Sequence, residues 1–254
     1  MKCNICQAEM SCVDQENSIY FCPDCRLYRQ KGTFFRAPQN DIEEEKLMDS
    51  LEALRRENYR GILHALRQHL KGENLHGLDV GCARGWFLDE AGKVGIAMDG
   101  IEPEPRFYEM ARPYGDYVEK GLFPQNFHPQ QDHAAYDFII FNDVFEHLPD
   151  LDVTLAYCVK LLKPKGLLVI NCPDSRGIFF QVAKMLHKLG VDSYWRRLWQ
   201  LDFYSPHLWY FSAGNLDRLM QKYHLVSEGG GQTLLYYQQM DFSNVSCAAR
   251  KSGY

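Results

Sequence analysis

Short apolar runs alternate with stretches of helical periodicity between residues 75 and 171. The runs are apolar at nearly every position, which is typical of strands that are buried on both faces. Strands that alternate with helices predict a parallel sheet, because each parallel connection must cross back over the sheet. We expect strands at 75–80, 96–101, 117–119, 137–142 and 167–171, and helices at 86–94, 105–112 and 151–162.

The flanking segments complete the predicted fold. Apolar residues recur at helical spacing over 41–70, 178–189 and 215–223. Two closing strands at 234–238 and 245–249 are expected to form a hairpin at one edge of the sheet. Together these elements predict an α/β fold with a Rossmann-like, doubly wound, mostly parallel seven-stranded sheet.

Four cysteines near the N-terminus form two Cys-x2-Cys pairs, Cys3 with Cys6 and Cys22 with Cys25. Each pair places two sulfurs on one side of a turn, and two such pairs can enclose a Zn²⁺ ion tetrahedrally. Because four thiolates leave no open position for water, the predicted role of the metal is structural. A chance cluster of thiols and a redox dithiol are the alternatives. Cys12 is expected to take no part, although it could replace one of the four ligands.

The same segment sets the predicted domain boundary. Its apolar positions are too few for a core of its own, so a metal must hold it together. We therefore expect a zinc ribbon at 1–37 and the α/β domain at 38–254. Within the latter, the aromatic-rich stretch at 175–212 is expected to act as a lid over a substrate, with a share of its rings in the core.

Charge and hydropathy narrow the function classes. The net charge of −5 disfavours a dedicated nucleic-acid binder, which usually carries a basic excess. Recruitment of RNA stays open as an alternative because four basic residues follow the second cysteine pair, namely Arg26, Arg29, Lys31 and Arg36. No run reaches the 18 apolar residues of a membrane span, and Met1 and Lys2 lead directly into Cys3 without a secretory segment. We expect a cytoplasmic protein.

The turn after the first parallel strand argues for a nucleoside ligand without phosphates. A dinucleotide-binding fingerprint needs glycines at positions 81, 83 and 86, and this chain has Gly81, Ala83 and Trp86 there. A tryptophan at the start of the helix would keep a pyrophosphate away. Gly81 and Gly85 still permit close approach of a ligand to the backbone. Glu102 ends the second strand about twenty residues later, where a carboxylate can accept hydrogen bonds from both ribose hydroxyls.

The ordered set of these segments resembles the class I S-adenosylmethionine-dependent methyltransferases. The motifs are the turn at 78–85, the strand end at 100–103, the stretch at 136–150 and the strand at 161–170, and the similarity spans about residues 75–225. The bacterial group with ubiquinone-biosynthesis O-methyltransferases and sugar methyltransferases is the most similar by motif. Ala83 departs from the usual glycine of this family.

This resemblance implies a set of cofactor contacts. The methionine and ribose side would be lined by Asp79, Gly81, Ala83 and Gly85, and Glu102 would bind the ribose. The adenine would lie near Gly121 and Leu122, after the third strand, and the sulfonium would lie beside Asn142 and Asp143, after the fourth strand.

The nature of the methyl acceptor is inferred from the segment after the fourth strand. Enzymes that methylate base amino groups carry a Pro-Pro-aromatic motif there, and this chain has Asn142 and Asp143 instead. His147 is the candidate general base, because an imidazole can take up a proton at cellular pH. Glu146 is expected to orient it, and His207 is a second candidate.

These residues predict methyl transfer to a hydroxyl, or an acidic carbon, of a small molecule or glycan. Three alternatives stay open. His147 could pack beneath its loop without a chemical role, the zinc ribbon could recruit RNA as the substrate, or the chain could be a non-catalytic module that binds the cofactor and displays the ribbon to a partner.

Overall fold

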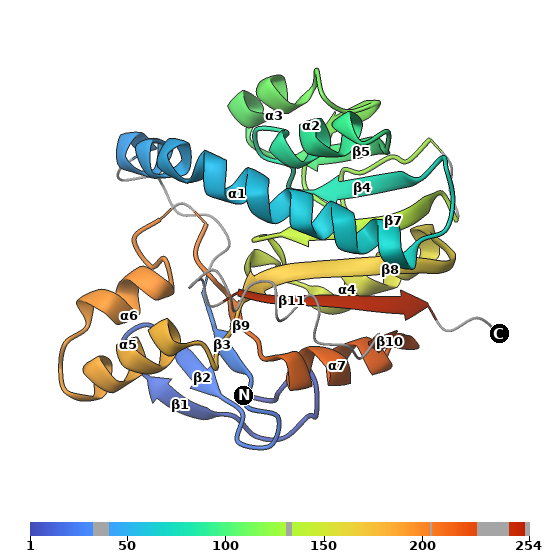
Figure 1. Cartoon of the computed structure of the whole chain (residues 1–254). Helices are drawn as coiled ribbons and strands as arrows, with labels where there is room; N and C mark the ends of the chain where they lie inside the picture. The colour runs from blue at the N-terminus through green and yellow to red at the C-terminus, as the bar shows by residue number, and fades with distance from the viewer. Residues whose placement is uncertain (33–40, 131–133, 204, 228–243, 252–254) are drawn as a thin grey trace.

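The computed structural model describes residues 1–32, 41–130, 134–203, 205–227 and 244–251. In this part of the chain a seven-stranded sheet has the order β10-β11-β8-β7-β4-β5-β6 (Figure 1). Its strands are β4 (His76–Val80), β5 (Ala97–Glu102), β6 (Tyr117–Lys120), β7 (Tyr136–Asn142), β8 (Leu162–Pro173), β10 (Leu225–Ser227) and β11 (Asn244–Lys251). Strands β8, β7, β4, β5 and β6 are parallel, and β11 and β10 continue the sheet beyond β8 as antiparallel strands. The predicted α/β, Rossmann-like fold is confirmed.

Helices cover both faces of this sheet, and alternate residues of each strand supply the two cores. Phe138 and Ile140 of β7 pack with α1 (Asp41–His69) and α2 (Trp86–Lys93). Ile139 and Phe141 point the other way, into a core with α4 (Leu151–Leu161) and α7 (Ala213–Gln221). The short α3 (Pro105–Ala111) contributes Ala111 to the first core. No helix in the described ranges is both long and apolar enough to cross a membrane.

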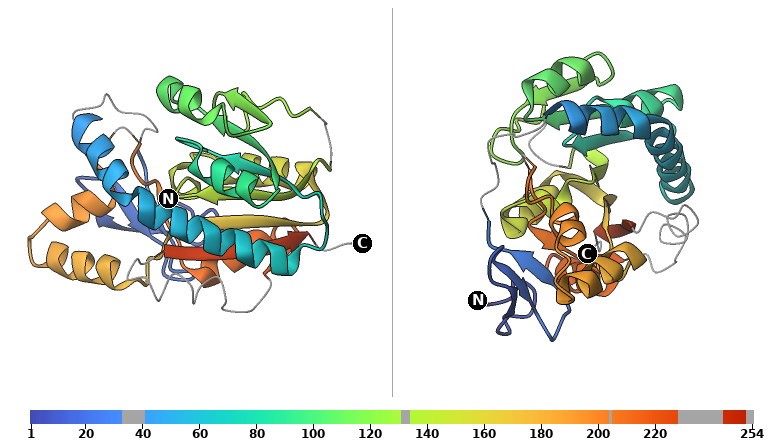
Figure 2. Two further views of the ribbon diagram at one scale, coloured as in Figure 1. Left: turned by 45° about the horizontal axis from the view of Figure 1, so that its top comes forward. Right: turned by 90° about the vertical axis from the view of Figure 1, so that its left-hand side faces the viewer.

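The N-terminal segment forms a second sheet with a distant part of the chain. Strands β1 (Ser11–Asp14), β2 (Ile19–Phe21) and β3 (Tyr28–Gln30) are antiparallel, and β3 also pairs with β9 (Trp209–Tyr210). The order is β1-β2-β3-β9, so the predicted ribbon shares a sheet with the predicted lid. Figure 2 shows the N-terminal strands beside α5 (Ile178–Lys188) and α6 (Ser193–Leu198).

A third core fills the space between the ribbon and these two helices. Its buried aromatic residues come from β3, α5, the end of α6 and β9 and include Tyr28, Phe180, Trp195, Trp199 and Tyr210. The Trp195 indole also donates a hydrogen bond to Asp14 of β1 over 3.0 Å. Much of the aromatic stretch therefore packs in a core that strands β2 and β3 share with α5, α6 and β9.

Two details differ from the expected strands. β8 begins at Leu162 rather than at 167, because Leu162 pairs with Tyr136 and Leu167 with Phe138, so the expected turn at 163–166 bulges out of a longer strand. The closing strand expected at 234–238 lies outside the described residues. The edge strand that the structure describes is β10, which pairs with β11, and β11 includes the strand expected at 245–249.

Candidate active site and metal centre

The turn between β4 and α2 folds back onto the end of β5. The amides of Gly81 and Cys82 both donate to the carbonyl of Ile101, over 2.8 and 3.1 Å. Gly81, Ala83 and Gly85 all have positive φ, at 72°, 46° and 76°. At Gly85 an added Cβ would come within 2.8 Å of the Ala111 Cα, so both the backbone angle and the packing favour glycine there.

Glu102 anchors this turn from the end of β5. Its carboxylate accepts one hydrogen bond from the Ala83 amide and one from the Glu104 amide, each over 2.8 Å. Burial raises the pKa of Glu102 to about 7, although the two backbone hydrogen bonds act in the opposite direction. A carboxylate can accept about four hydrogen bonds, so both oxygens keep acceptor capacity for a ligand.

Asp79 is a second buried carboxylate in the same place. Burial, and then the charge of Glu102, raise the pKa of Asp79 to about 8, while the nearby Asn142 side chain acts against them. Asp79 Oδ1 and both amide atoms of Asn142 make no hydrogen bond within the described ranges. Buried polar atoms without partners are costly and are typical of sites that bind a ligand.

A cleft opens at these groups, and part of its wall comes from α1. Its lining includes Arg55, Tyr59, Asp79, Gly81, Ala83 and Asn142. The guanidinium of Arg55 lies 3.5 Å from the Asp143 carboxylate. Arg55 and Tyr59 were not among the residues expected from the sequence. Their spacing of four on a helix places them on one face, but only the packing of α1 over the strand ends shows which face that is.

The remaining predicted cofactor residues surround this cleft at different distances. Gly121 donates its amide to the carbonyl of Glu102 over 3.1 Å, which places the turn after β6 beside the end of β5. Leu122 donates to Asn126 in that turn. Gly85 packs against Ala111 behind the turn. The structure thus brings Asp79, Gly81, Ala83, Glu102 and Asn142 together, with Gly121 and Leu122 at the periphery.

His147 and His207 meet next to the end of β7. His147 lies in the 3₁₀ helix η1 (Phe145–His147), and its Nδ1 lies 3.0 Å from the carbonyl of Pro206 and 3.2 Å from the Ser205 hydroxyl. Because a carbonyl can only accept, Nδ1 carries the proton, and the neutral ring then leaves Nε2 unprotonated and able to accept one. Burial lowers the pKa of His147 to about 4, so the ring is neutral at pH 7.

His207 has the same arrangement. Its Nδ1 lies 3.0 Å from the Tyr210 hydroxyl, which itself donates to the carbonyl of Leu198 over 2.7 Å. The Tyr210 oxygen must therefore accept from His207, which again leaves the Nε2 lone pair free. Burial lowers the pKa of His207 well below its usual value.

Glu146 completes a buried cluster with the two histidines. Its Oε1 lies 3.9 Å from His207 Nε2, and neither carboxylate oxygen has a hydrogen-bond partner within the described ranges. Burial raises the pKa of Glu146 well above its usual value. One ligand atom from each of the three residues lies within 4.8 Å of the others, so the cluster has the donor set of a divalent cation site as well as that of a base.

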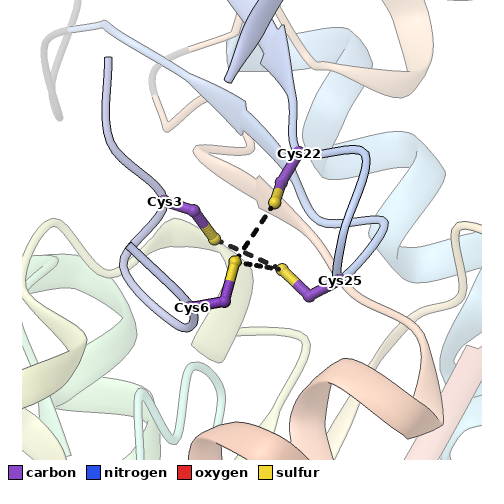
Figure 3. A group of neighbouring side chains, drawn as sticks. All are labelled: Cys3, Cys6, Cys22 and Cys25. Carbon is purple, nitrogen blue, oxygen red and sulfur yellow. Dashed lines mark hydrogen bonds between the residues drawn. The ribbon is translucent and has the colours of Figure 1, made fainter. Parts of the chain in front are cut away.

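The four predicted zinc ligands also come together (Figure 3). Their Sγ atoms are 3.3 Å apart for Cys3 and Cys25, 3.4 Å for Cys6 and Cys22, and 3.7 Å for Cys6 and Cys25. A tetrahedral zinc site with Zn–S bonds of about 2.3 Å has sulfur–sulfur edges of about 3.8 Å, so the cluster needs little expansion. Cys12 is exposed on β1 and does not belong to it.

Comparison with known proteins agrees with this fold. The methyltransferase domain family matches residues 50–226. The ubiquinone biosynthesis O-methyltransferase of Rhodopseudomonas palustris is 26% identical over 100 residues, which are 39% of this chain and 40% of that protein. The mitochondrial human enzyme of the same name is 27% identical over 120 residues, which are 43% of this chain and 32% of that protein. The matched segment thus spans about two fifths or less of these relatives.

Solved structures match over more of the chain. An S-adenosylmethionine-dependent methyltransferase from Thermotoga maritima has a TM-score of 0.55 at 19% identity, covering 83% of this chain and 96% of that one. A second, from Mesorhizobium loti, has a TM-score of 0.52 at 17% identity, covering 73% and 95%. At these identities the likeness establishes the fold. With the family match over residues 50–226, it follows that this protein belongs to the methyltransferase domain family.

Proposed function

We propose that the protein transfers a methyl group from S-adenosylmethionine to a hydroxyl, or an acidic carbon, of a small molecule or glycan. The observation that carries this proposal is the unprotonated Nε2 of His147 in η1, which follows β7 at the edge of the sheet where the strands of Asp79 and Glu102 also end. The names of the matched relatives, which are O-methyltransferases, support a hydroxyl as the acceptor.

The residues of the cleft suit the cofactor. Glu102 has acceptor capacity for the ribose hydroxyls, and the unpaired Asp79 and Asn142 side chains offer polar partners for the methionine portion. The positive charge of Arg55, in the wall of the cleft, would attract the carboxylate of the ligand. Gly81, Ala83 and Gly85 shape the turn that would approach it, and Gly121, Leu122 and Asp143 would border it. When bound, S-adenosylmethionine supplies an electrophilic methyl group on its sulfonium.

His147 then acts on the acceptor. With S-adenosylmethionine held in the cleft as the methyl donor, Nε2 of His147 would accept the proton of the acceptor hydroxyl. The carbonyl of Pro206 holds the ring in the required tautomer. Glu146 and His207 lie beside it and would position the acceptor or stabilise the resulting imidazolium.

The test is turnover of a His147→Gln variant with a panel of hydroxylated acceptors. We expect kcat to fall by about a hundredfold or more, with the affinity for S-adenosylhomocysteine unchanged, because general base catalysis contributes about 10²–10⁴ to the rate. His64→Gln is the matched control, since His64 is exposed on α1. Full turnover in His147→Gln would exclude the base assignment.

For the N-terminal segment we propose a structural zinc ribbon. The four sulfurs support it, as does the sheet through which β3 holds β9. One of the four basic residues on which RNA recruitment would depend is engaged within the protein. Arg29 is half-buried, stacks over Trp209 at 4.6 Å and donates a hydrogen bond to Asn4. Arg36 lies outside the described residues.

The alternative of a non-catalytic module is tested by the same panel of acceptors, because such a module would transfer a methyl group to none of them.

A further inference from the structure

Helix α5 carries large apolar side chains that face solvent. Ile178, Met185 and Leu189 are 70%, 55% and 72% exposed and recur at the spacing of one helix face. We call this surface the α5 stripe. It consists of Ile178, Phe179, Val182, Met185 and Leu189, and Val191 and Tyr194, which follow α5 in the sequence, are exposed as well. Most of the exposed large apolar side chains of the described residues lie within residues 178–194.

The stripe is not needed to hold α5 in place. The opposite face of the helix buries Phe180 and Ala183 against the third core, where Phe180 packs on Tyr28 and Trp195. Figures 1 and 2 show α5 and α6 next to the ribbon, on the side of the molecule away from α2 and α3. An exposed apolar helix face of this kind is typical of an interaction site.

The segment that holds the stripe carries an excess of positive charge, in a chain whose net charge is −5. Residues 176–197 contain five lysines and arginines and a single acid, Asp192, which bonds to His187. Among the five, Arg176 pairs with Asp174, Arg196 pairs with Asp202, and Lys184 points to the Tyr28 ring. Lys188 on α5 and Arg197 on α6 are exposed. The helix with the apolar face and its neighbour α6 therefore each expose a cation.

We propose that the α5 stripe docks the protein on the surface of an anionic lipid bilayer, with α5 lying in the interface. An apolar helix face bordered by lysine and arginine is the pattern of helices that lie on membranes, and cations near an anionic surface add to their binding. A second copy of the chain fits less well, since two stripes face to face would bring these cations together. The proposal does not depend on the methyl-transfer reaction.

Co-sedimentation of the full-length protein with vesicles tests it. We expect binding to vesicles of phosphatidylcholine with phosphatidylglycerol, little binding to phosphatidylcholine alone, and weaker binding as salt is added. The triple variant Ile178→Gln, Met185→Gln, Leu189→Gln and the double variant Lys188→Glu, Arg197→Glu should each bind about tenfold more weakly or worse. Val153→Gln is the matched control, because Val153 is exposed on α4, away from the stripe.

Retained affinity for S-adenosylhomocysteine shows that each variant is folded. The proposal is overturned if the wild-type protein sediments with neither vesicle, or if the triple variant sediments as the wild type does. A dimer in solution that the triple variant converts to a monomer, without vesicle binding by the wild type, would assign the stripe to a second copy of the chain instead.

Discussion

His147 and His207 lie edge to face, with their ring centroids 4.7 Å apart. They lie 60 residues apart in the sequence, and different elements hold them. His147 follows β7 of the large sheet, whereas His207 precedes β9, whose strand partner is β3 of the ribbon. The main-chain amide of Gln30 in β3 also donates to the carbonyl of Leu208 over 2.8 Å. The geometry of the histidine pair therefore depends on the N-terminal segment.

Loss of one zinc ligand should affect both stability and turnover. In Cys22→Ser we expect less than one zinc per chain and a free energy of unfolding lower by about 2 kcal/mol or more, because a structural metal contributes directly to folding. For a chain of this size that lowers Tm by about 4–8 °C. Turnover should fall more than cofactor affinity, since β3 supports β9. Elemental analysis and thermal unfolding measure these effects, with Cys12→Ser as the control; equal zinc content in the two variants would refute the assignment.

Binding of a nucleoside should depend on the ionisation of Glu102. 5′-Methylthioadenosine is a suitable probe because it lacks the charged amino acid portion of the cofactor. The pKa of Glu102 is raised to about 7, and its carboxylate is the stronger acceptor for ribose hydroxyls. Affinity should rise between about pH 6 and 8 in the wild type and stay flat and weaker in Glu102→Gln. Calorimetric titration at several pH values decides this, and a flat wild-type profile would count against the ribose contact.

Asp79→Asn should stabilise the ligand-free protein at alkaline pH. In the folded protein the pKa of Asp79 is raised to about 8, above the value of an unfolded aspartate. The stability that protonated Asp79 contributes to the fold is therefore fully present at low pH and is lost as the pH rises through 8. We expect the variant to gain Tm over the wild type at pH 9 more than at pH 5. Its affinity for S-adenosylmethionine should nevertheless fall by about tenfold, because a buried acceptor is lost. Equal gains in Tm at both pH values would contradict the burial of an ionisable Asp79.

The turn at Gly85 should tolerate no side chain. Gly85→Ala forces a Cβ to within 2.8 Å of backbone at a φ of 76°, and we expect a cost of about 2 kcal/mol or more in unfolding free energy. The matched change Gly92→Ala, within α2, meets no atom within 4 Å and should be neutral or stabilising by up to about 1 kcal/mol. Denaturant unfolding of both variants measures the difference, and equal stabilities would show that the turn can relax.

Local patterns in the sequence predicted the parts of this structure that local physics determines. The apolar runs predicted the parallel strands because such strands are buried on both faces. β7 is an example, since alternate residues of this strand pack in two different cores. The two cysteine pairs predicted the sulfur cluster because each pair lies within one turn. Glu102 and Ala83 could be placed together because parallel strands end at one edge of the sheet.

Contacts between distant segments were not predictable in this way. The pairing of β3 with β9 joins residues that no periodicity relates, and a two-residue strand leaves almost no pattern. Arg55 approaches Asp143 only because α1 crosses the strand ends at a particular angle. The early start of β8 could not be predicted because the sequence at 163–166, Lys-Pro-Lys-Gly, is typical of a turn. In the structure this segment bulges from β8, which pairs with β7 both before it, at Leu162, and after it, at Leu167.

The most direct test of the account is a calorimetric titration of the zinc-replete protein with S-adenosylhomocysteine and with S-adenosylmethionine. The structure predicts one site per chain with a micromolar dissociation constant for both ligands, weakened about tenfold or more in Glu102→Ala, where the carboxylate beside the Ala83 amide is lost. Absence of binding by either ligand, in protein shown to carry none from purification, would contradict the assignment of this cleft as the cofactor site.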